Sequence, residues 1–387
     1  MNDSSCDFDR LLDRSGTGSI KWGSVAGGQL AMGLADMDFA AAPPILEALA
    51  ARVEHGVFGY TEAGQSFYSA IVNWVFERRG WVIEPEWITP APGIMPSMAH
   101  LMRSTLEPGS GVIVQTPAFS PIPHVIADNN FVVVENSLQL VDNRYEMDLE
   151  ALETAAARPD VHAMVLCSPH NPSGRVWSRE ELEAVAELCE THNVLVISDE
   201  IHGEVIFPGR SFTPYGMVAH PTARHATLFG PSKGFNLPGL RTAVTVIPDE
   251  SLRSEFRREL TRVNEDFGIN PMGALALEAA YTLGADWLDA LTTYLQGNMD
   301  ELTEGLAATT AAVTVIPPDA SFLVWLDCRA LGLTDEELKH RFDQAGVLIE
   351  PGINFGHDGS GFVRINVGTT RARVTEAVER VSKSLAM

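Results

Sequence analysis

The chain has 387 residues, of which 45% are hydrophobic, so it can bury a large core and is expected to form two domains. Its formal net charge of -24 argues against binding to nucleic acids or anionic membranes, because both need a basic surface. We expect no signal peptide and no membrane span, and four scattered cysteines without CxxC spacing indicate free thiols in the cytoplasm: Cys6, Cys167, Cys189 and Cys328.

The first 42 residues are predicted to be largely irregular. The pair Asp36 and Asp38 could suggest a metal site, but no histidine or third carboxylate is nearby in the sequence. Solvation or capping in a loop is therefore the favoured interpretation of this pair. Helices are predicted over residues 43–55 and 64–79, with the aromatic loop that holds Tyr60 between them.

A Gly/Pro turn in PAPGIMPSMAHLM then leads into another helix, whose first backbone amides could hold an anion. A regular alternation of strands and helices follows. Strands are predicted over 112–115, 131–135, 163–167 and 194–198, and helices over 122–127, 148–157 and 178–192. Asp148 is a predicted N-cap, and Ser178 with Glu181 has the spacing of a capping box. This alternation indicates an α/β fold with a mostly parallel sheet that has helices on both sides.

Three polar residues follow the ends of predicted strands in this region. Asn171 comes four residues after one strand, and Asp199 comes directly after the next. Lys233 lies in a Gly-Pro-Ser-Lys-Gly turn between strands predicted at 226–229 and 241–247. Ligands of parallel sheets bind beyond the carboxyl ends of the strands. A lysine buried there would have a lowered pKa and a nucleophilic amine, whereas a surface lysine that caps a turn is the plainer interpretation.

After residue 270 the pattern changes to that of a smaller α+β domain. Helices are predicted over 272–282, 287–309 and 334–345, and strands over 322–327 and 362–367. We therefore expect a large domain over residues 43–282 and a small domain over 283–387, which the N-terminal segment 1–42 joins.

A lysine that forms a Schiff base with an aldehyde cofactor needs three kinds of partner. A carboxylate must keep a ring nitrogen protonated, which Asp199 could do, and polar groups must hold a ring hydroxyl. Asn171 and His202 could supply those polar groups, and Phe119 could stack on the ring. A phosphate could be bound by the following residues: Ser232, Arg241, and the amides of Gly93, Ile94 and Met95.

The motifs SPHNPSGR, ISDEIH and PSKGFNLPGLR, in that order, resemble those of the fold-type I pyridoxal phosphate enzymes of the class I/II aminotransferase family. The segments RSGTGSIKW, LADMDF and EAAYTLGADWLDALTTYLQGN narrow the resemblance to the cystathionine β-lyase (C–S lyase) subgroup. The likeness extends over essentially the whole chain. It implies pyridoxal 5'-phosphate as the cofactor and a homodimer whose subunits share their active sites.

The resemblance also implies a role for each matching residue. Lys233 would carry the cofactor and move protons, Asp199 would pair with the ring nitrogen, and Asn171 and His202 would bond the ring oxygen. Ser232 and Arg241 would bind the phosphate, and Tyr60 would reach it from the second subunit. The expected substrate contacts are Ala35, Asn171 and Arg364, with the Arg364 guanidinium on the substrate carboxylate. Each of these polar residues could instead belong to a structural network or ion pair.

The expected reaction is β-elimination of a thiol from a cysteine S-conjugate, with pyruvate and ammonia as the other products. An aminotransferase, a decarboxylating deaminase and a regulatory protein that acts through partners are the alternatives. Two positions differ from the lyase pattern, because Gly33 and Phe119 stand where the family usually has a tryptophan and a tyrosine. We expect a wider pocket from these differences, and a substrate bulkier than cystathionine.

Overall fold

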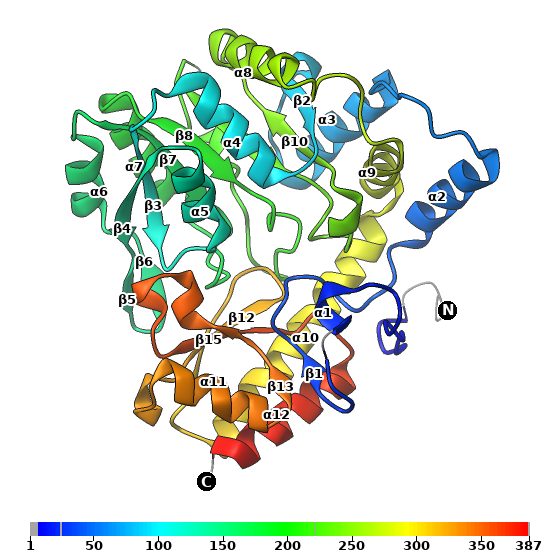
Figure 1. Ribbon diagram of the computed structural model, residues 1–387, viewed down its shortest axis with the longest axis vertical. Coiled ribbons are helices and arrows are strands. Elements are labelled where there is room, and N and C mark those ends of the chain that lie inside the picture. The colour runs from blue at the N-terminus through cyan, green and yellow to red at the C-terminus, as the bar shows by residue number, and fades with distance from the viewer. Residues whose placement is uncertain (1–6, 24, 221, 386–387) are drawn as a thin grey trace.

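The computed structural model describes residues 7–23, 25–220 and 222–385 (Figure 1). Its larger sheet has seven strands in the order β2-β10-β9-β8-β7-β3-β4. The strands are β2 (Ile88–Ala91), β3 (Gly111–Thr116), β4 (Val132–Ser137), β7 (Val161–Cys167), β8 (Leu195–Asp199), β9 (His225–Phe229) and β10 (Ala243–Val246). Five neighbouring strands, β4 to β9 in the sheet order, are parallel, and only β10 pairs antiparallel with both of its neighbours. The predicted mostly parallel sheet is confirmed.

Helices cover both faces of this sheet. One face packs against α4 (Ile94–Thr105), α5 (Pro121–Asp128) and α8 (Glu250–Arg262). The other face packs against α6 (Leu149–Ala156), α7 (Arg179–Thr191), α3 (Gln65–Arg79) and α9 (Pro271–Leu283). The helix α2 (Pro43–His55) lies on α9. Strands that are buried on both faces need continuous apolar runs, which is why β8 reads Leu-Val-Ile-Ser.

A smaller antiparallel sheet forms the other end of the molecule in Figure 1. Its strands, in sheet order, are β11 (Thr314–Ile316), β12 (Leu323–Asp327), β15 (Phe362–Asn366) and β14 (Glu350–Pro351). The helices α11 (Asp335–Gln344) and α12 (Arg371–Leu385) lie beside it, and the long helix α10 (Ala285–Thr309) runs from this end toward α9. A smaller α+β part was expected here, and it is present. The boundaries at residues 42 and 282 stay predictions.

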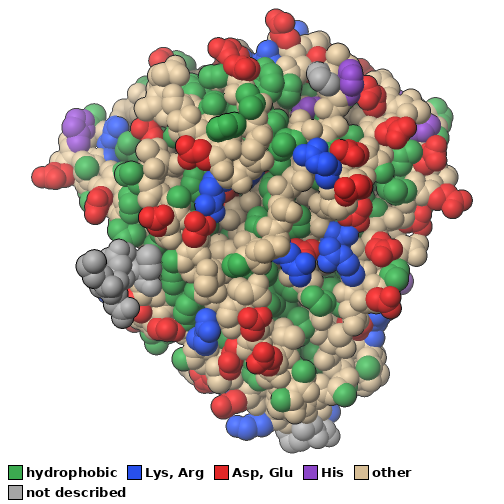
Figure 2. All heavy atoms as spheres, turned by 180° about the vertical axis from the view of Figure 1, so that it is seen from behind, with side chains coloured by type: hydrophobic (Ala, Val, Ile, Leu, Met, Phe, Trp, Pro, Cys, Tyr) green, Lys and Arg blue, Asp and Glu red, His purple; other side chains and the backbone are tan. Residues whose placement is uncertain are grey.

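Short elements complete the chain. The N-terminal strand β1 (Leu30–Ala31) pairs in parallel with β13 (Val347–Leu348), so an early segment of the chain joins the small C-terminal part. The remaining α-helix and strands are α1 (Ile20–Gly23), β5 (Gln139–Val141) and β6 (Arg144–Glu146), and short 3-10 helices connect several elements. No helix in the described ranges is long and apolar enough to cross a membrane. On the face in Figure 2, acidic side chains are scattered among uncharged ones rather than gathered in one patch.

Helix caps define several boundaries as predicted. Asp148 accepts a hydrogen bond from the amide of Ala151, and the capping box of Ser178 and Glu181 is present in full. Such caps satisfy backbone amides that have no partner inside the helix. The helices α8 and α12 were not predicted, although Asp249 caps α8 in the same way.

Candidate functional site

A cavity of about 260 Å³ lies beyond the carboxyl ends of β7, β8 and β9, and we call it the inner cavity. Most residues singled out in the sequence line it: Ala35, Gly93, Ile94, Met95, Phe119, Asn171, Asp199, His202, Ser232, Lys233 and Arg241. Cys167, Ile201, Pro238 and Thr242 line it as well, although no sequence pattern pointed to them. The shared strand ends explain why residues far apart in the sequence meet here.

The amine of Lys233 lies in this cavity, in the turn that follows β9. Its Nζ donates a hydrogen bond of 2.7 Å to the carbonyl oxygen of Ala35. Burial and the nearby Arg364 lower the pKa of Lys233 to about 8, although the carboxylates of Asp36 and Asp199 oppose this shift. A lysine with such a pKa has a sizeable neutral fraction near neutral pH, so it can act as a nucleophile or a base.

Asp199 ends β8 and lies beside Cys167, its partner in the register with β7. It is only 4% exposed, and its Oδ1 accepts a hydrogen bond from the amide of Ile201 at 3.1 Å. Burial raises the pKa of Asp199 to about 6, against the effect of that amide and of Lys233. Its Oδ2 has no hydrogen-bond partner in the described part of the protein. A buried carboxylate with a free oxygen is suited to bind a cationic N–H group of a ligand.

His202 and Asn171 bring two further polar groups to the cavity wall. The Nδ1 of His202 lies 3.0 Å from Oγ of Ser321, which leaves its Nε2 for the cavity. Burial, with the charges of Lys233 and Arg364, lowers the pKa of His202 well below its ordinary value, so its ring is neutral. Asn171 accepts a hydrogen bond from Arg364 through its Oδ1. Its amide nitrogen is therefore the donor that Asn171 can offer to a ligand.

Another part of the inner cavity wall is suited to an anion. The helix α4 begins at Ile94, directly after Gly93, whose φ of 152° favours glycine. No side chain caps this helix, so its first amides are free to bind a ligand. Ser232 and Arg241 lie at the same cavity, and Arg241 has a φ of 47° that marks a tight turn before β10. A phosphate group fits such a set of donors.

A second cavity of about 510 Å³, which we call the outer cavity, adjoins the inner one and shares Ala35, Phe119, Lys233 and Pro238 with it. Arg364 of β15 lines it and is 3% exposed. Its Nη1 donates to Asn171 at 3.1 Å and its Nη2 to the carbonyl oxygen of Gly33 at 3.0 Å. Within the described residues its buried Nε has no partner. Burial lowers the pKa of Arg364 to about 10, but the group stays charged at neutral pH.

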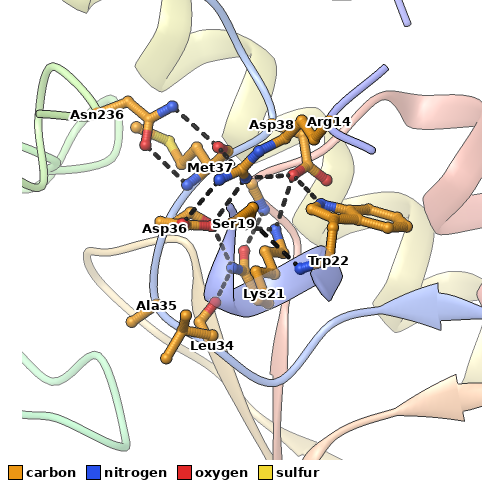
Figure 3. A network of polar contacts seen from close by, with 12 residues as sticks. Arg14, Ser19, Lys21, Trp22, Leu34, Ala35, Asp36, Met37, Asp38 and Asn236 are labelled. Atoms are coloured by element: carbon orange, nitrogen blue, oxygen red, sulfur yellow. Dashed lines mark hydrogen bonds and ion pairs between the residues drawn. The ribbon is translucent and has the colours of Figure 1, made fainter. Parts of the chain in front are cut away.

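Residues 33–39, which we call the connecting segment, contribute Ala35 to both cavities and Leu34 and Asp36 to the outer one. Figure 3 shows the polar contacts that hold part of this segment. Asn236, from the turn after Lys233, holds the segment through the backbone of Met37 and Phe39. Asn366 of β15 donates to the carbonyl oxygens of Leu34 and Asp36. The segment is thus bound to the large sheet and to the small sheet at the same time, which fixes the Ala35 carbonyl beside Lys233.

The sequence interpretation of Asp36 and Asp38 was wrong. Asp38 is 2% exposed and accepts hydrogen bonds from Arg14, Lys21 and Trp22 (Figure 3). Arg14 also binds both carboxylate oxygens of Asp36 at 3.0 Å. Burial alone would raise the pKa of Asp38, but Lys21 and the hydrogen-bond donors hold it below its ordinary value. The pair therefore anchors the N-terminal residues instead of facing solvent.

Tyr60 and Gly33 both differ from the expectations drawn from the sequence. Tyr60 does not line the cavity: it is 90% exposed and packs edge-to-face against Phe267 at 5.0 Å. At Gly33, a Cβ atom would lie only 3.0 Å from the backbone of Ile349. The close packing of two backbones explains a glycine there, so Gly33 does not simply leave an empty space for substrate.

Cys6 lies outside the described residues, whereas Cys167, Cys189 and Cys328 have free thiols.

Comparison with known proteins gives one family. The family model for aminotransferase class I and II matches residues 29–381. Cystathionine beta-lyase PatB of Bacillus subtilis is 40% identical over 98% of this chain and 99% of its own length. The crystal structure of cystalysin from Treponema denticola, which contains pyridoxal 5'-phosphate, has a TM-score of 0.93 at 27% identity, over 98% of both chains. The pyridoxal phosphate-bound C–S lyase of Staphylococcus hominis has a TM-score of 0.91 at 28% identity, over 98% of this chain and 99% of its own.

Proposed function

Because the chain belongs to the aminotransferase class I and II family, we propose that it is a pyridoxal phosphate-dependent C–S β-lyase that acts on cysteine S-conjugates. The reaction breaks the Cβ–S bond of the conjugate and consumes one water molecule. Its products are a thiol, pyruvate and ammonium. One observation carries the proposal: Lys233 lines both cavities, between the acid Asp199 and the cation Arg364.

The residues of the inner cavity fit pyridoxal phosphate. The free Oδ2 of Asp199 suits a protonated pyridine nitrogen, and the donors of Asn171 and His202 suit a ring oxygen. The uncapped start of α4, with Ser232 and Arg241, suits the phosphate. Phe119 offers an apolar face to the ring. When bound, the cofactor supplies an electron-withdrawing ring that accepts the charge left when the substrate loses its Cα proton.

Lys233 is the proton carrier of the proposed mechanism. Its amine removes the Cα proton, and burial together with Arg364 keeps part of the lysine neutral for this step. The resulting ammonium then gives a proton to the leaving sulfur, so the thiol departs without a net charge. The hydrogen bond to the Ala35 carbonyl holds the amine at the junction of the two cavities.

Arg364 is the proposed anchor for the substrate's carboxylate. Asn171 and Gly33 hold its two Nη atoms, which fixes the plane of the guanidinium. Each Nη keeps one further hydrogen, and these two can then bind the carboxylate oxygens. A carboxylate fixed in this way places the substrate's Cα near Lys233.

We also propose a homodimer in which Tyr60 of each subunit reaches the phosphate site of the other. Its exposure, beside the exposed apolar side chains of Val57, Phe58 and Phe267, supports a partner surface at this position. The three free thiols among the described residues fit the reducing cytoplasm, where we place the protein.

The test uses purified protein loaded with pyridoxal phosphate and S-methylcysteine as the first substrate. We expect thiol and pyruvate to appear in equal amounts. The family is also named for amino transfer, and the same base could return the proton to another carbon, so an aminotransferase or decarboxylating deaminase is the second candidate. Transfer of the amino group to an added keto acid, or release of carbon dioxide, without thiol release would replace our proposal with that one.

A further inference from the structure

The outer cavity extends the site from Lys233 toward the surface. Beyond the residues that it shares with the inner cavity, its wall has an apolar part, which is formed by Ile20, Leu34, Pro121 and Phe355. The rest of this wall is mostly polar or charged: Arg14, Ser19, Asp36, Ser120, Glu350 and Arg364. Ile20 is 85% exposed and marks the opening to solvent. With a volume of about 510 Å³, the outer cavity has room for a group larger than the amino acid portion of a substrate.

Most charged groups of the outer cavity already have a partner. Arg14 is bound through both Nη atoms by Asp36, with distances of 3.0 Å, so these two charges offset each other. Arg364 is the proposed partner of the substrate's carboxylate, and Lys233 is the proposed proton carrier. Among the described residues, one further charged side chain lines this cavity, and it is the carboxylate of Glu350.

Glu350 lies on β14, directly opposite Arg364 in the antiparallel register with β15. Residues that face each other in this way project from the same side of the sheet. Its Oε1 accepts a hydrogen bond of 2.7 Å from the side-chain Nδ2 of Asn354, but within the described ranges no basic nitrogen lies within 4.0 Å of its carboxylate. The charge of Glu350 does reach Arg364, because it opposes the lowering of the pKa of Arg364 by burial.

We propose that the outer cavity binds the S-substituent of the substrate, and that Glu350 selects substituents that end in an ammonium group. The substrate class is therefore a cysteine thioether with an aminoalkyl arm, whose methylene groups contact the apolar wall. This inference rests on the proposed C–S lyase function. A substituent that ends in a carboxylate would face Glu350 as a like charge and bind less well.

The experiment compares three cysteine thioethers of equal arm length: S-(2-aminoethyl)-, S-(2-hydroxyethyl)- and S-(carboxymethyl)cysteine. For the wild-type holoenzyme we expect kcat/KM for the ammonium substrate to exceed that for the carboxylate substrate by roughly ten-fold or more, the effect of one partly desolvated charge pair. In Glu350→Gln this ratio should fall to about a tenth of its wild-type value. Glu336→Gln, which removes an exposed acid of α11 outside the cavity, should keep the wild-type ratio.

A second measurement separates this inference from the proposed function. The same three compounds are titrated into Lys233→Ala loaded with pyridoxal phosphate, and their Kd values are measured by calorimetry. If the wild-type holoenzyme releases no thiol and pyruvate from any compound, but adding Glu350→Gln to the Lys233→Ala variant changes the order of the Kd values, the lyase function is wrong and the selection by Glu350 stands. If the compounds are turned over with equal kcat/KM, or if Glu350→Gln keeps the wild-type ratio, the inference about Glu350 is overturned.

Discussion

The Nη1 of Arg364 donates a hydrogen bond to Oδ1 of Asn171 at 3.1 Å, although 193 positions separate the two residues. Arg364 comes from the small sheet, and Asn171 from the loop after β7 in the large sheet. The Arg364 guanidinium, which we propose binds the substrate, is thus oriented by a residue from a loop of the other sheet. Small changes on either side of this contact should alter substrate binding.

Arg364→Lys should lower kcat/KM by about a hundred-fold, mainly through a higher KM. Lysine keeps the charge but loses the planar fork that binds two carboxylate oxygens, and it cannot reach both Asn171 and Gly33. Steady-state kinetics with S-methylcysteine measure the change. A variant with an unchanged KM would show that Arg364 does not hold the substrate's carboxylate.

Lys233→Ala should lower kcat by at least about a thousand-fold, because the mutant lacks the amine that moves protons. The covalent link to the cofactor should also be lost. Borohydride reduction followed by peptide mapping should place the cofactor's mass on the peptide that holds Lys233 in the wild-type protein. If the mass appears on a peptide with Lys21 instead, the assignment of the reactive lysine is wrong.

Asp199→Asn should lower kcat by about a hundred-fold or more, since a neutral amide cannot favour a protonated ring nitrogen. The volume of the side chain is nearly unchanged, so folding should be retained. Steady-state kinetics measure kcat, and the absorbance spectrum of the variant loaded with pyridoxal phosphate checks that the protein still folds and binds the cofactor. Wild-type kcat with a wild-type spectrum would remove Asp199 from the proposed mechanism.

Glu200 should make the stability of the protein depend on pH. It is fully buried near Arg79, and burial raises its pKa to about 7, with Arg79 opposing. Between pH 4.5, the ordinary pKa of a glutamate, and about pH 7, the carboxyl group of Glu200 binds a proton more tightly in the folded state than in the unfolded state. The free energy of unfolding therefore falls as the pH rises through this window, by up to about 3 kcal/mol, and the loss is complete above it.

Urea unfolding of the wild type and of Glu200→Gln at pH 5 and pH 8 measures this effect. The amide cannot ionise, so the variant should gain stability relative to the wild type as the pH rises. Glu187→Gln, on the exposed face of α7, serves as the control and should show no such gain. If the free energies of unfolding of the wild type and of Glu200→Gln differ by the same amount at both pH values, the prediction is contradicted.

Asp38→Asn should lower the free energy of unfolding by about 3 kcal/mol, because it leaves the buried ammonium of Lys21 without its nearest carboxylate. Arg373 loses an ion-pair partner in the same variant. Thermal and urea unfolding measure the loss. Asp128→Asn, an exposed change at the end of α5, should have almost no effect, and equal stability of the two variants would refute a role for this buried cluster.

Local signals in the sequence predicted much of the fold. The predicted helix over 43–55 coincides with α2, and the capping box appears where the spacing of Ser178 and Glu181 indicated. These signals succeed because a helix cap involves residues only three positions apart. The alternation of strands and helices also predicted the parallel sheet, and with it the common location of Asn171, Asp199 and Lys233.

Features that depend on distant partners were missed. Nothing in the apolar run of β10 shows that it pairs antiparallel with β2 and β9. The burial of Asp38 was also missed, because it depends on how the chain folds back on itself: one partner, Arg373, is 335 positions away, and even Arg14, Lys21 and Trp22 are not adjacent in the sequence. Glu350 gave no signal, since β14 has only two residues and thus no periodicity. The acceptor of the Lys233 amine is a backbone carbonyl, which no side-chain pattern can reveal.

The connecting segment also constrains when the site can be completed during folding. Gly33 receives a hydrogen bond from Arg364, 331 positions further along the chain, so this contact cannot exist until nearly the whole polypeptide has been synthesised. The large sheet can assemble on the ribosome before that point, with its reactive lysine in place but one wall still absent. Catalytic competence should therefore arrive as a late event in biogenesis, after the nascent chain leaves the exit tunnel.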